Sequence, residues 1–228
     1  MHGPGPLTLG PEAAKRLATV MRVAPGDEVV LFAGDGREWR ARVESAAKAA
    51  VVVRVEGLAR QAPPPGVVLE LWLATIRANR FELALEKCTE AGADVIRPVV
   101  CEHSQRGDEA SAARRERWQR IVVEAAEQSG RLYLPVVAGA TPLARAVESF
   151  HGALVFGDVS GMGVRDIQAL LPSTGHFAFV VGPEGGLSGE EEALLRHRGA
   201  LPLALGPNIL RSETAAIAGT ALLRALTA

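Results

Sequence analysis

The sequence FAFVVGPEGGLS at residues 177–188 is the clearest indication of the fold class. An apolar run is followed by a glycine-rich loop at 182–186, and Ser188 with Glu191 has the spacing of a helix capping box. This order predicts a buried strand, a tight loop and then a helix. Ligands of open α/β sheets bind at the carboxyl ends of strands, where glycines let them approach the backbone. The loop is therefore a candidate ligand site, and a turn without a ligand is the alternative.

Residues 203–215, LALGPNILRSETA, repeat this pattern closer to the C-terminus. A predicted strand at 201–205 ends in Gly-Pro and leads into a predicted helix at 211–226. The apolar side chains that can form walls for a flat ring are Leu205, Ile209 and Leu210. Arg211 and Glu213 add charge beside them. The alternative is an ordinary loop in which these two form a surface ion pair of little energetic value.

Both loops differ from the common nucleotide-binding loops. No Gly-Lys-Ser/Thr follows the first loop, and neither loop has the G-x-G-x-x-G spacing. The histidines show no metal-ligand spacing. Cys88 and Cys101 are too few for a disulfide framework or a four-ligand metal site. We therefore expect a ligand site without a metal.

The segment APPPG at 62–66 is the clearest linker, because consecutive prolines disfavour helix and cannot lie in a central strand. Before it, a helix is predicted near the N-terminus, followed by three β-rich runs, two of which flank the turn Asp35-Gly36. The predicted helix is 11–21, with Leu17, Val20 and Met21 on its apolar side, and the runs are 27–32, 38–43 and 50–55. This composition predicts a small β domain at 1–66.

After the linker, apolar strands alternate with helices, which predicts an α/β domain at 67–228 with a mostly parallel sheet. The expected strands are 67–75, 94–100, 153–156, 177–181 and 201–205. The expected helices are one with Asn79 as N-cap that ends at Gly92, then 112–129, one that begins at Thr141-Pro142, 188–198 and 211–226.

Composition excludes several classes of protein. The chain has 228 residues, 48% hydrophobic and 22% charged, with a net charge of −1, which excludes wholesale disorder and a histone-like polycation. No apolar run is long enough to span a membrane, and residues 1–10 lack the features of a signal peptide, so we expect a cytoplasmic protein. Arginine supplies 22 of the 25 basic residues. Arginine grips phosphate well, and codon bias is the alternative explanation.

Two predicted helices carry sets of charged and polar side chains. In the first, the spacings of three and four residues keep the side chains on one face, and its members are Arg117, Arg120, Glu124, Gln128 and Arg131. The second set surrounds the predicted helix at 79–91 and contains Arg77, Arg80, Glu86, Lys87 and Glu90. A solvated helix face is the usual explanation for such a set. RNA contact and subunit contact are the alternatives for the first.

Taken together and in order, these stretches resemble the RsmE family of ribosomal RNA methyltransferases, within the SPOUT superfamily. The matching stretches are LATVMR at 17–22, LEKCTEAGA at 85–93, RI at 120–121 with EAAEQSGR at 124–131, GPEGG at 182–186, and LG at 205–206 with ILRSETA at 209–215. They span nearly the whole chain, and the last two are specific as a pair.

The resemblance implies a SPOUT-type α/β methyltransferase domain with a trefoil knot, preceded by a small PUA-like β-barrel domain that binds RNA. It implies S-adenosylmethionine (SAM) as cofactor, a homodimer, and 16S rRNA in the small ribosomal subunit as partner. The implied reaction is methylation of N3 of one uridine. Another SPOUT enzyme that acts on a different rRNA or tRNA position, and a non-catalytic RNA-binding assembly factor, remain alternatives.

The resemblance and the chemistry together give the expected site. Uridine N3 must lose a proton before it attacks, so the enzyme needs a base or a cation that stabilises the anion. Arg211 is the candidate for anion stabilisation, and Glu184 and Glu213 compete as the base or its orienter. Cofactor contacts are expected from Phe156, Gly157, Val181, Gly182, Pro183, Glu184, Gly185, Gly186, Leu205, Gly206, Asn208, Ile209, Leu210 and Thr214. RNA contacts are expected from Arg16, Arg22, Arg77, Arg106 and Arg131.

Overall fold

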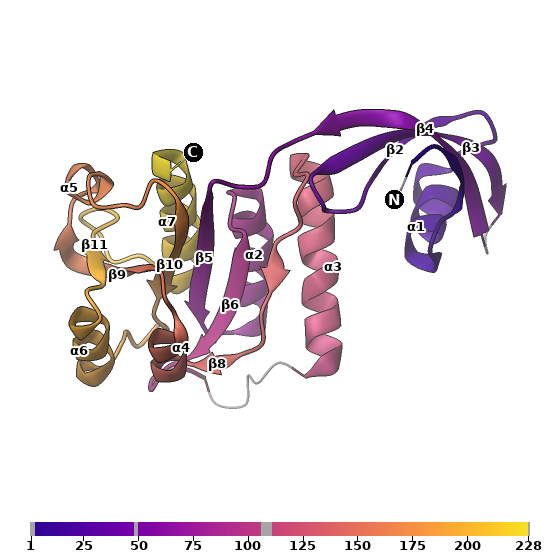
Figure 1. Ribbon diagram of the computed structural model, residues 1–228. Helices are drawn as coiled ribbons and strands as arrows, with labels where there is room; N and C mark the ends of the chain where they lie inside the picture. The colour runs from indigo at the N-terminus through magenta and orange to yellow at the C-terminus, as the bar shows by residue number, and fades with distance from the viewer. Residues whose placement is uncertain (1–2, 48–49, 106–110, 228) are drawn as a thin grey trace. The chain divides into compact units, whose positions relative to one another are not determined.

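The computed structural model describes residues 3–47, 50–105 and 111–227 (Figure 1). The chain divides into two compact units, and the division falls between Pro64 and Pro65, inside the proline-rich linker. Within the described residues, no helix is long and apolar enough to cross a membrane.

The N-terminal unit contains an antiparallel four-stranded sheet in the order β1-β4-β3-β2. Its strands are β1 (Gly5–Thr8), β2 (Glu28–Phe32), β3 (Arg37–Ala47) and β4 (Ala50–Gln61). β2 and β3 form the hairpin predicted from Asp35-Gly36, and Gly36 has a φ of 88° that favours glycine. Alternate β3 residues, among them Trp39 and Val43, are buried against β4.

The single helix predicted near the N-terminus is wrong in its second half. α1 (Pro11–Lys15) is α-helical, but Arg16–Met21 continue as a π-helical turn. The turn ends at Arg22, which has a φ of 54°, the only positive φ of a non-glycine residue in the described chain. Val20 and Met21 are 75% and 60% exposed instead of packed inward. The prediction assumed 3.6 residues per turn, and a π-helical turn departs from that spacing.

The sheet of the N-terminal unit carries exposed arginines that are paired with glutamates on neighbouring strands. The pairs are Arg42 with Glu28 and Glu56, Arg54 with Glu44, and Arg60 with Glu38, all within 3.0 Å. We call this set the paired-arginine face. Because each of these three cations faces a carboxylate, together they add little net positive charge to the sheet.

The C-terminal unit contains a parallel sheet in the order β11-β9-β10-β5-β6-β7, with β8 also paired to β6. The strands are β5 (Val67–Ala74), β6 (Val95–Val100), β7 (Val136–Val137), β8 (Thr141–Pro142), β9 (Ala153–Met162), β10 (Gly175–Val181) and β11 (Leu201–Leu203). The helices are α2 (Ala78–Glu90), α3 (Ala112–Ser129), α4 (Leu143–Ser149), α5 (Val164–Gln168), α6 (Gly189–His197) and α7 (Ser212–Thr227). The predicted α/β class is confirmed.

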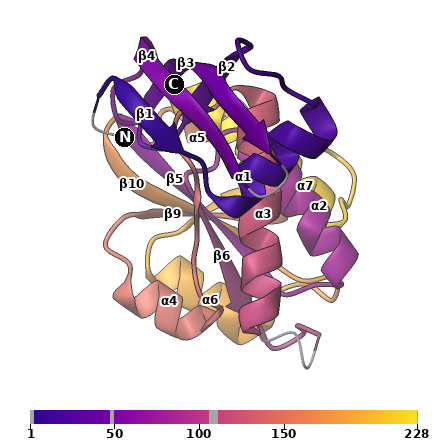
Figure 2. The same cartoon turned by 90° about the vertical axis from the view of Figure 1, so that its right-hand side faces the viewer.

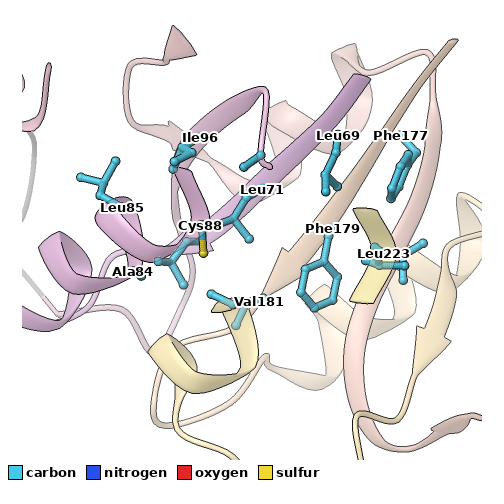
Figure 3. Packing of buried hydrophobic residues seen from close by; sticks show 14 of the residues in the cluster. Leu69, Leu71, Ala84, Leu85, Cys88, Ile96, Phe177, Phe179, Val181 and Leu223 are labelled. Carbon is cyan, nitrogen blue, oxygen red and sulfur yellow. The ribbon is translucent and has the colours of Figure 1, made fainter. Parts of the chain in front are cut away.

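Helices cover both faces of this sheet, which explains why its strands are apolar throughout. On one face, odd-numbered residues of β5 and β10, such as Leu71 and Phe179, pack against α2 and α7 (Figure 3). On the other face, even-numbered residues, such as Trp72 and Val180, pack in a cluster with residues of α4 and α6. Figure 2 shows the two helical layers on either side of the strands.

Some element boundaries differ from the predictions. α2 begins at Ala78 with Arg77 flanking it, so Asn79 is not its N-cap. Thr141–Pro142 pair with β6, and α4 begins only at Leu143. The capping box at the start of α6 is confirmed.

β9 is longer than the predicted strand at 153–156, because it leaves its neighbour β11 and returns. Pro202 pairs with Phe156, whereas the next residue, Leu203, pairs with Met162. The intervening residues 157–161 therefore bulge out of the ladder. At Gly161 the backbones approach closely, since a Cβ there would lie 2.7 Å from the carbonyl carbon of Pro202.

Arg131, expected to contact RNA, instead holds three segments of the C-terminal unit together. Its guanidinium donates to the carbonyl oxygens of Thr89 and Ala93, at 2.8 and 2.7 Å, and to the carboxylate of Asp94, at 3.1 Å. Arg224 of α7 binds the same carboxylate. Asp94 precedes β6, so this cluster lies at the amino end of the sheet.

Candidate functional site

The carboxyl ends of β10 and β11 and the bulge of β9 converge on one cavity of about 410 Å³. Pockets for small ligands in proteins commonly span roughly 300–1,000 Å³. The lining residues are Gly157, Asp158, Val159, Val181, Gly182, Pro183, Glu184, Gly186, Leu187, Glu192, Leu203, Leu205, Gly206, Asn208, Ile209, Leu210, Arg211, Ser212 and Ala215. The two glycine-marked loops of the sequence therefore meet at one pocket.

Most of the residues expected to bind the cofactor line this cavity, and three do not. Phe156 is fully buried in the core, Gly185 packs against His103, and Thr214 is exposed on the first turn of α7. Other lining residues were not predicted, chiefly Asp158, Val159, Leu187 and Glu192. Asp158 and Val159 lie on the bulge of β9, which no sequence pattern marks. Leu187 and Glu192 lie on either side of the first residues of α6, where the capping box marks the start of the helix but not which side chains face the cavity.

The first pocket loop is a turn held by its own backbone and by the cap of α6. The Gly186 amide donates to the Pro183 carbonyl at 2.9 Å. Ser188 accepts a bond from the Glu191 amide at 3.4 Å, and the Glu191 carboxylate accepts one from the Ser188 amide at 2.9 Å. Gly182 packs tightly, since a Cβ there would lie 3.1 Å from Leu187 Cγ. These bonds shape the wall that the loop gives to the cavity.

The second pocket loop follows β11. The Ala204 amide donates to the Met162 carbonyl at 2.9 Å, so the loop starts from the far side of the β9 bulge. Gly206 has a φ of 144°, a conformation that other residues rarely adopt. Ile209 is 86% exposed although it lines the cavity. The loop therefore gives the cavity an apolar rim with open backbone groups beside it.

Asp158, on the bulge of β9, supplies a fixed negative charge to the pocket wall. Burial opposes its ionisation, but hydrogen bonds from the Ser160 amide and hydroxyl and from Arg196 outweigh that effect and hold the pKa of Asp158 below its usual range. The Arg196 guanidinium lies 2.6 Å from the carboxylate and also packs over the Phe156 ring at 5.1 Å. The pocket therefore has a carboxylate that stays ionised at neutral pH.

The three expected catalytic residues lie in different environments. Arg211 and Glu184 are exposed and line the cavity. Glu213 is 8% exposed, does not line the cavity, and forms a 2.6 Å ion pair with Arg80 of α2. Its second oxygen, Oε2, has no hydrogen-bond partner among the described residues. The alternative of a surface ion pair between Arg211 and Glu213 is therefore wrong, because Glu213 turns inward to α2.

The remaining arginines expected to contact RNA lie outside the pocket. Arg16 and Arg22 are exposed on the π-helical turn of the N-terminal unit, and Arg77 is exposed just before α2. Arg106 lies outside the described residues.

Thiol and metal chemistry find little support in the described part of the chain. Burial raises the pKa of both Cys88 and Cys101 to about 12, so neither is a thiolate at neutral pH. Among the described residues, no group of three or more histidine, cysteine, aspartate or glutamate side chains could hold a metal ion.

Comparisons with known proteins agree with this arrangement. The profile of the RNA methyltransferase domain matches residues 63–224, and that of the RNA methyltransferase PUA domain matches residues 12–56. The Ribosomal RNA small subunit methyltransferase E of Mycobacterium bovis is 36% identical over 210 residues, which cover 87% of this chain and 78% of the relative. The protein of the same name from Synechocystis is 34% identical and covers 92% of this chain and 70% of the relative.

Two solved structures are also similar. A chain from Legionella pneumophila, solved with the cofactor SAM, has a TM-score of 0.90 at 32% identity, covering 99% of this chain and 94% of that one. Ribosomal RNA small subunit methyltransferase E from Neisseria gonorrhoeae, bound to S-adenosyl methionine, has a TM-score of 0.86 at 27% identity, with the same coverage. Since these matches span both units and agree with the motifs of the sequence, the chain belongs to the ribosomal RNA small subunit methyltransferase E family.

Proposed function

We propose that this chain is an enzyme that transfers a methyl group from SAM to the 16S rRNA of the small ribosomal subunit. The observation that carries the proposal is the convergence of the carboxyl ends of β10 and β11 and the bulge of β9 on one cavity of about 410 Å³. Membership of the family and the SAM bound in two similar structures support it.

The pocket residues fit this cofactor. Gly182 and Gly206 have no side chains, so a ligand can approach their amides and carbonyls. Leu205 and Leu210 offer apolar contact to an adenine ring, and the Asp158 carboxylate, which is paired with Arg196, gives the pocket wall hydrogen-bond acceptors. When bound, SAM supplies a methyl group on a positively charged sulfur.

The reaction we propose is methylation of N3 of one uridine, as the family resemblance implies. Loss of the N3 proton leaves an anion spread over the two flanking carbonyl oxygens, and Arg211 offers a cation at the pocket to stabilise it. Glu184 is the better of the two candidate bases, because it is exposed at the cavity. Glu213 is engaged with Arg80, and we assign it an anchoring role at the start of α7.

The finer architecture belongs to the same proposal. We infer a trefoil knot around the pocket loops, a barrel-like closure of the N-terminal unit, and a homodimer that works in the cytoplasm. At the bulge of β9, the second pocket loop starts beside Met162, so two segments of the chain lie close together there. This close approach supports the inferred knot. Arg16, Arg22 and Arg77 are the described arginines that we assign to RNA phosphates, since they are exposed on their units.

The test is transfer of labelled methyl groups from SAM to RNA taken from a strain that lacks the enzyme. Separate reactions contain small subunits, large subunits and tRNA, and the modified base is then mapped. We expect label in small subunits only, at N3 of one uridine. Label confined to large subunits or tRNA would indicate another specificity. Failure to bind SAM in calorimetry would favour a non-catalytic RNA-binding factor.

A further inference from the structure

The loop after β6 contacts the first pocket loop, although more than eighty positions separate them in the chain. Residues 101–105 form a closed turn, in which the Cys101 amide donates to Ser104 Oγ at 2.9 Å and the Ser104 amide donates to the Cys101 carbonyl at 3.1 Å. Neither His103 nor any other residue of this turn lines the cavity. The turn therefore contacts the pocket wall from outside.

Three contacts join the loop after β6 to the first pocket loop and to the first turn of α6. The ring nitrogen Nδ1 of His103 lies 3.1 Å from the Gly186 carbonyl oxygen, and because a carbonyl only accepts, this nitrogen donates. The Glu102 amide donates to Oε1 of Glu191 at 2.9 Å, while Oε2 of the same carboxylate accepts from the Ser188 amide. A Cβ at position 185 would lie 3.0 Å from the His103 Cβ, so the glycine there permits the approach.

We propose that His103 and Glu191 are positioning residues that hold the turn at 183–186 in the shape that binds SAM, an inference that rests on the proposed function. Residues 184–186 of the turn are exposed, two of them are glycines, and the turn has one internal backbone bond. Glycines lose the most conformational freedom on ordering. Contacts that order the turn before the ligand arrives lower the cost of binding. The Glu191 carboxylate serves two purposes, capping α6 and fastening the loop after β6.

The role of His103 is tested with His103→Ala, His103→Asn and the control His197→Ala, which removes an exposed histidine of α6. Loss of one hydrogen bond is expected to weaken SAM binding about three- to tenfold in calorimetry. The asparagine amide nitrogen lies as many bonds from Cβ as Nδ1 does and keeps an N–H donor for the Gly186 carbonyl, so His103→Asn should restore most of the affinity. In catalysis, the KM for SAM should rise while kcat at saturating SAM stays within about twofold.

The role of the Glu191 carboxylate is tested with Glu191→Gln and two control variants. Ser188→Ala weakens the cap of α6 but keeps the Glu191–Glu102 bond, and Glu190→Gln removes an exposed charge from the same helix turn. Only Glu191→Gln should weaken SAM binding, by about tenfold, because a bond to a charged acceptor is lost. Thermal unfolding of each variant shows whether the fold is intact.

A readout without any ligand separates this inference from the proposed function. In the SAM-free protein, hydrogen exchange at the amides of Glu102 and Gly186 should be about tenfold faster in His103→Ala and Glu191→Gln than in their controls. Unchanged exchange, unchanged SAM affinity, or a His103→Asn variant as weak as His103→Ala would overturn the positioning role. If the wild-type protein does not bind SAM, the proposed function fails, and the exchange rates still decide whether the contacts order the turn.

Discussion

Replacing Gly161 by alanine should destabilise the C-terminal unit and distort the pocket. The new Cβ would lie 2.7 Å from the carbonyl carbon of Pro202 and 2.8 Å from the amide nitrogen of Leu203. Ordinary contacts begin at 3.4 Å, so β9 and β11 must separate by about 0.7 Å (3.4 minus 2.7). Both contacts are with backbone, and no side-chain rotation relieves them. β11 carries Leu203 of the pocket wall, so the cavity changes with it.

The expected loss of unfolding free energy in Gly161→Ala follows from two opposing effects. Overpacking of a close-packed site costs about 1–3 kcal/mol. A glycine-to-alanine change also lowers the entropy of the unfolded chain, which stabilises by about 0.4–1 kcal/mol. With the middle of each range, the net loss of unfolding free energy is about 1.3 kcal/mol. For a unit of this size, that loss lowers Tm by about 3–5 °C.

The assay follows unfolding of the C-terminal unit alone. Trp39 is the only tryptophan of the N-terminal unit, so a Trp39→Phe background leaves Trp72 and Trp118 as fluorescent reporters. Gly189→Ala is the matched control, because nothing lies within 4 Å of a Cβ there, and it should unfold at the same Tm or higher. A Gly161→Ala protein with the stability of Gly189→Ala would refute the close approach of β9 and β11.

Three further outcomes are expected. Arg211→Ala should slow methyl transfer in single turnovers by about 10²–10³-fold, as for loss of an oxyanion donor, while SAM affinity in calorimetry changes far less; equal activity removes Arg211 from the mechanism. Arg22→Ala should weaken RNA binding and lower the salt slope of log K by about one, and an unchanged slope would exclude a phosphate contact. The thiols of Cys88 and Cys101, with a pKa of about 12, should resist a thiol reagent at pH 8 until the protein is unfolded. Because their pKa is raised on folding, their contribution to stability is complete below about pH 8.5 and declines as the pH rises towards 12, which denaturation at several pH values would detect.

The elements that sequence predicts well are those set by local patterns. The helix at 112–129 and the capping box at Ser188 depend on residues within a few positions of each other, and both are confirmed. The π-helical turn at Arg16–Met21 and the length of β9 were missed. Their backbone follows from packing and strand pairing, which no period of apolar residues encodes.

The site divides in the same way. Glycine loops after apolar strands point to the pocket, because the carboxyl ends of parallel strands share one edge of the sheet. The inward turn of Glu213 to Arg80, across 133 positions, and the approach of His103 to Gly186, across 83, depend on which helices and loops pack together. The sequence alone therefore does not predict which of these distant residues contact each other.

The paired-arginine face has a consequence for non-specific binding to RNA. Ribosomal RNA carries a phosphate at every nucleotide, and a sheet with many unpaired guanidinium groups would bind it without specificity. Here glutamates occupy those groups in advance, at Arg42, Arg54 and Arg60. Phosphate must therefore displace a glutamate before it can bind any of these three arginines, which weakens non-specific attraction through them.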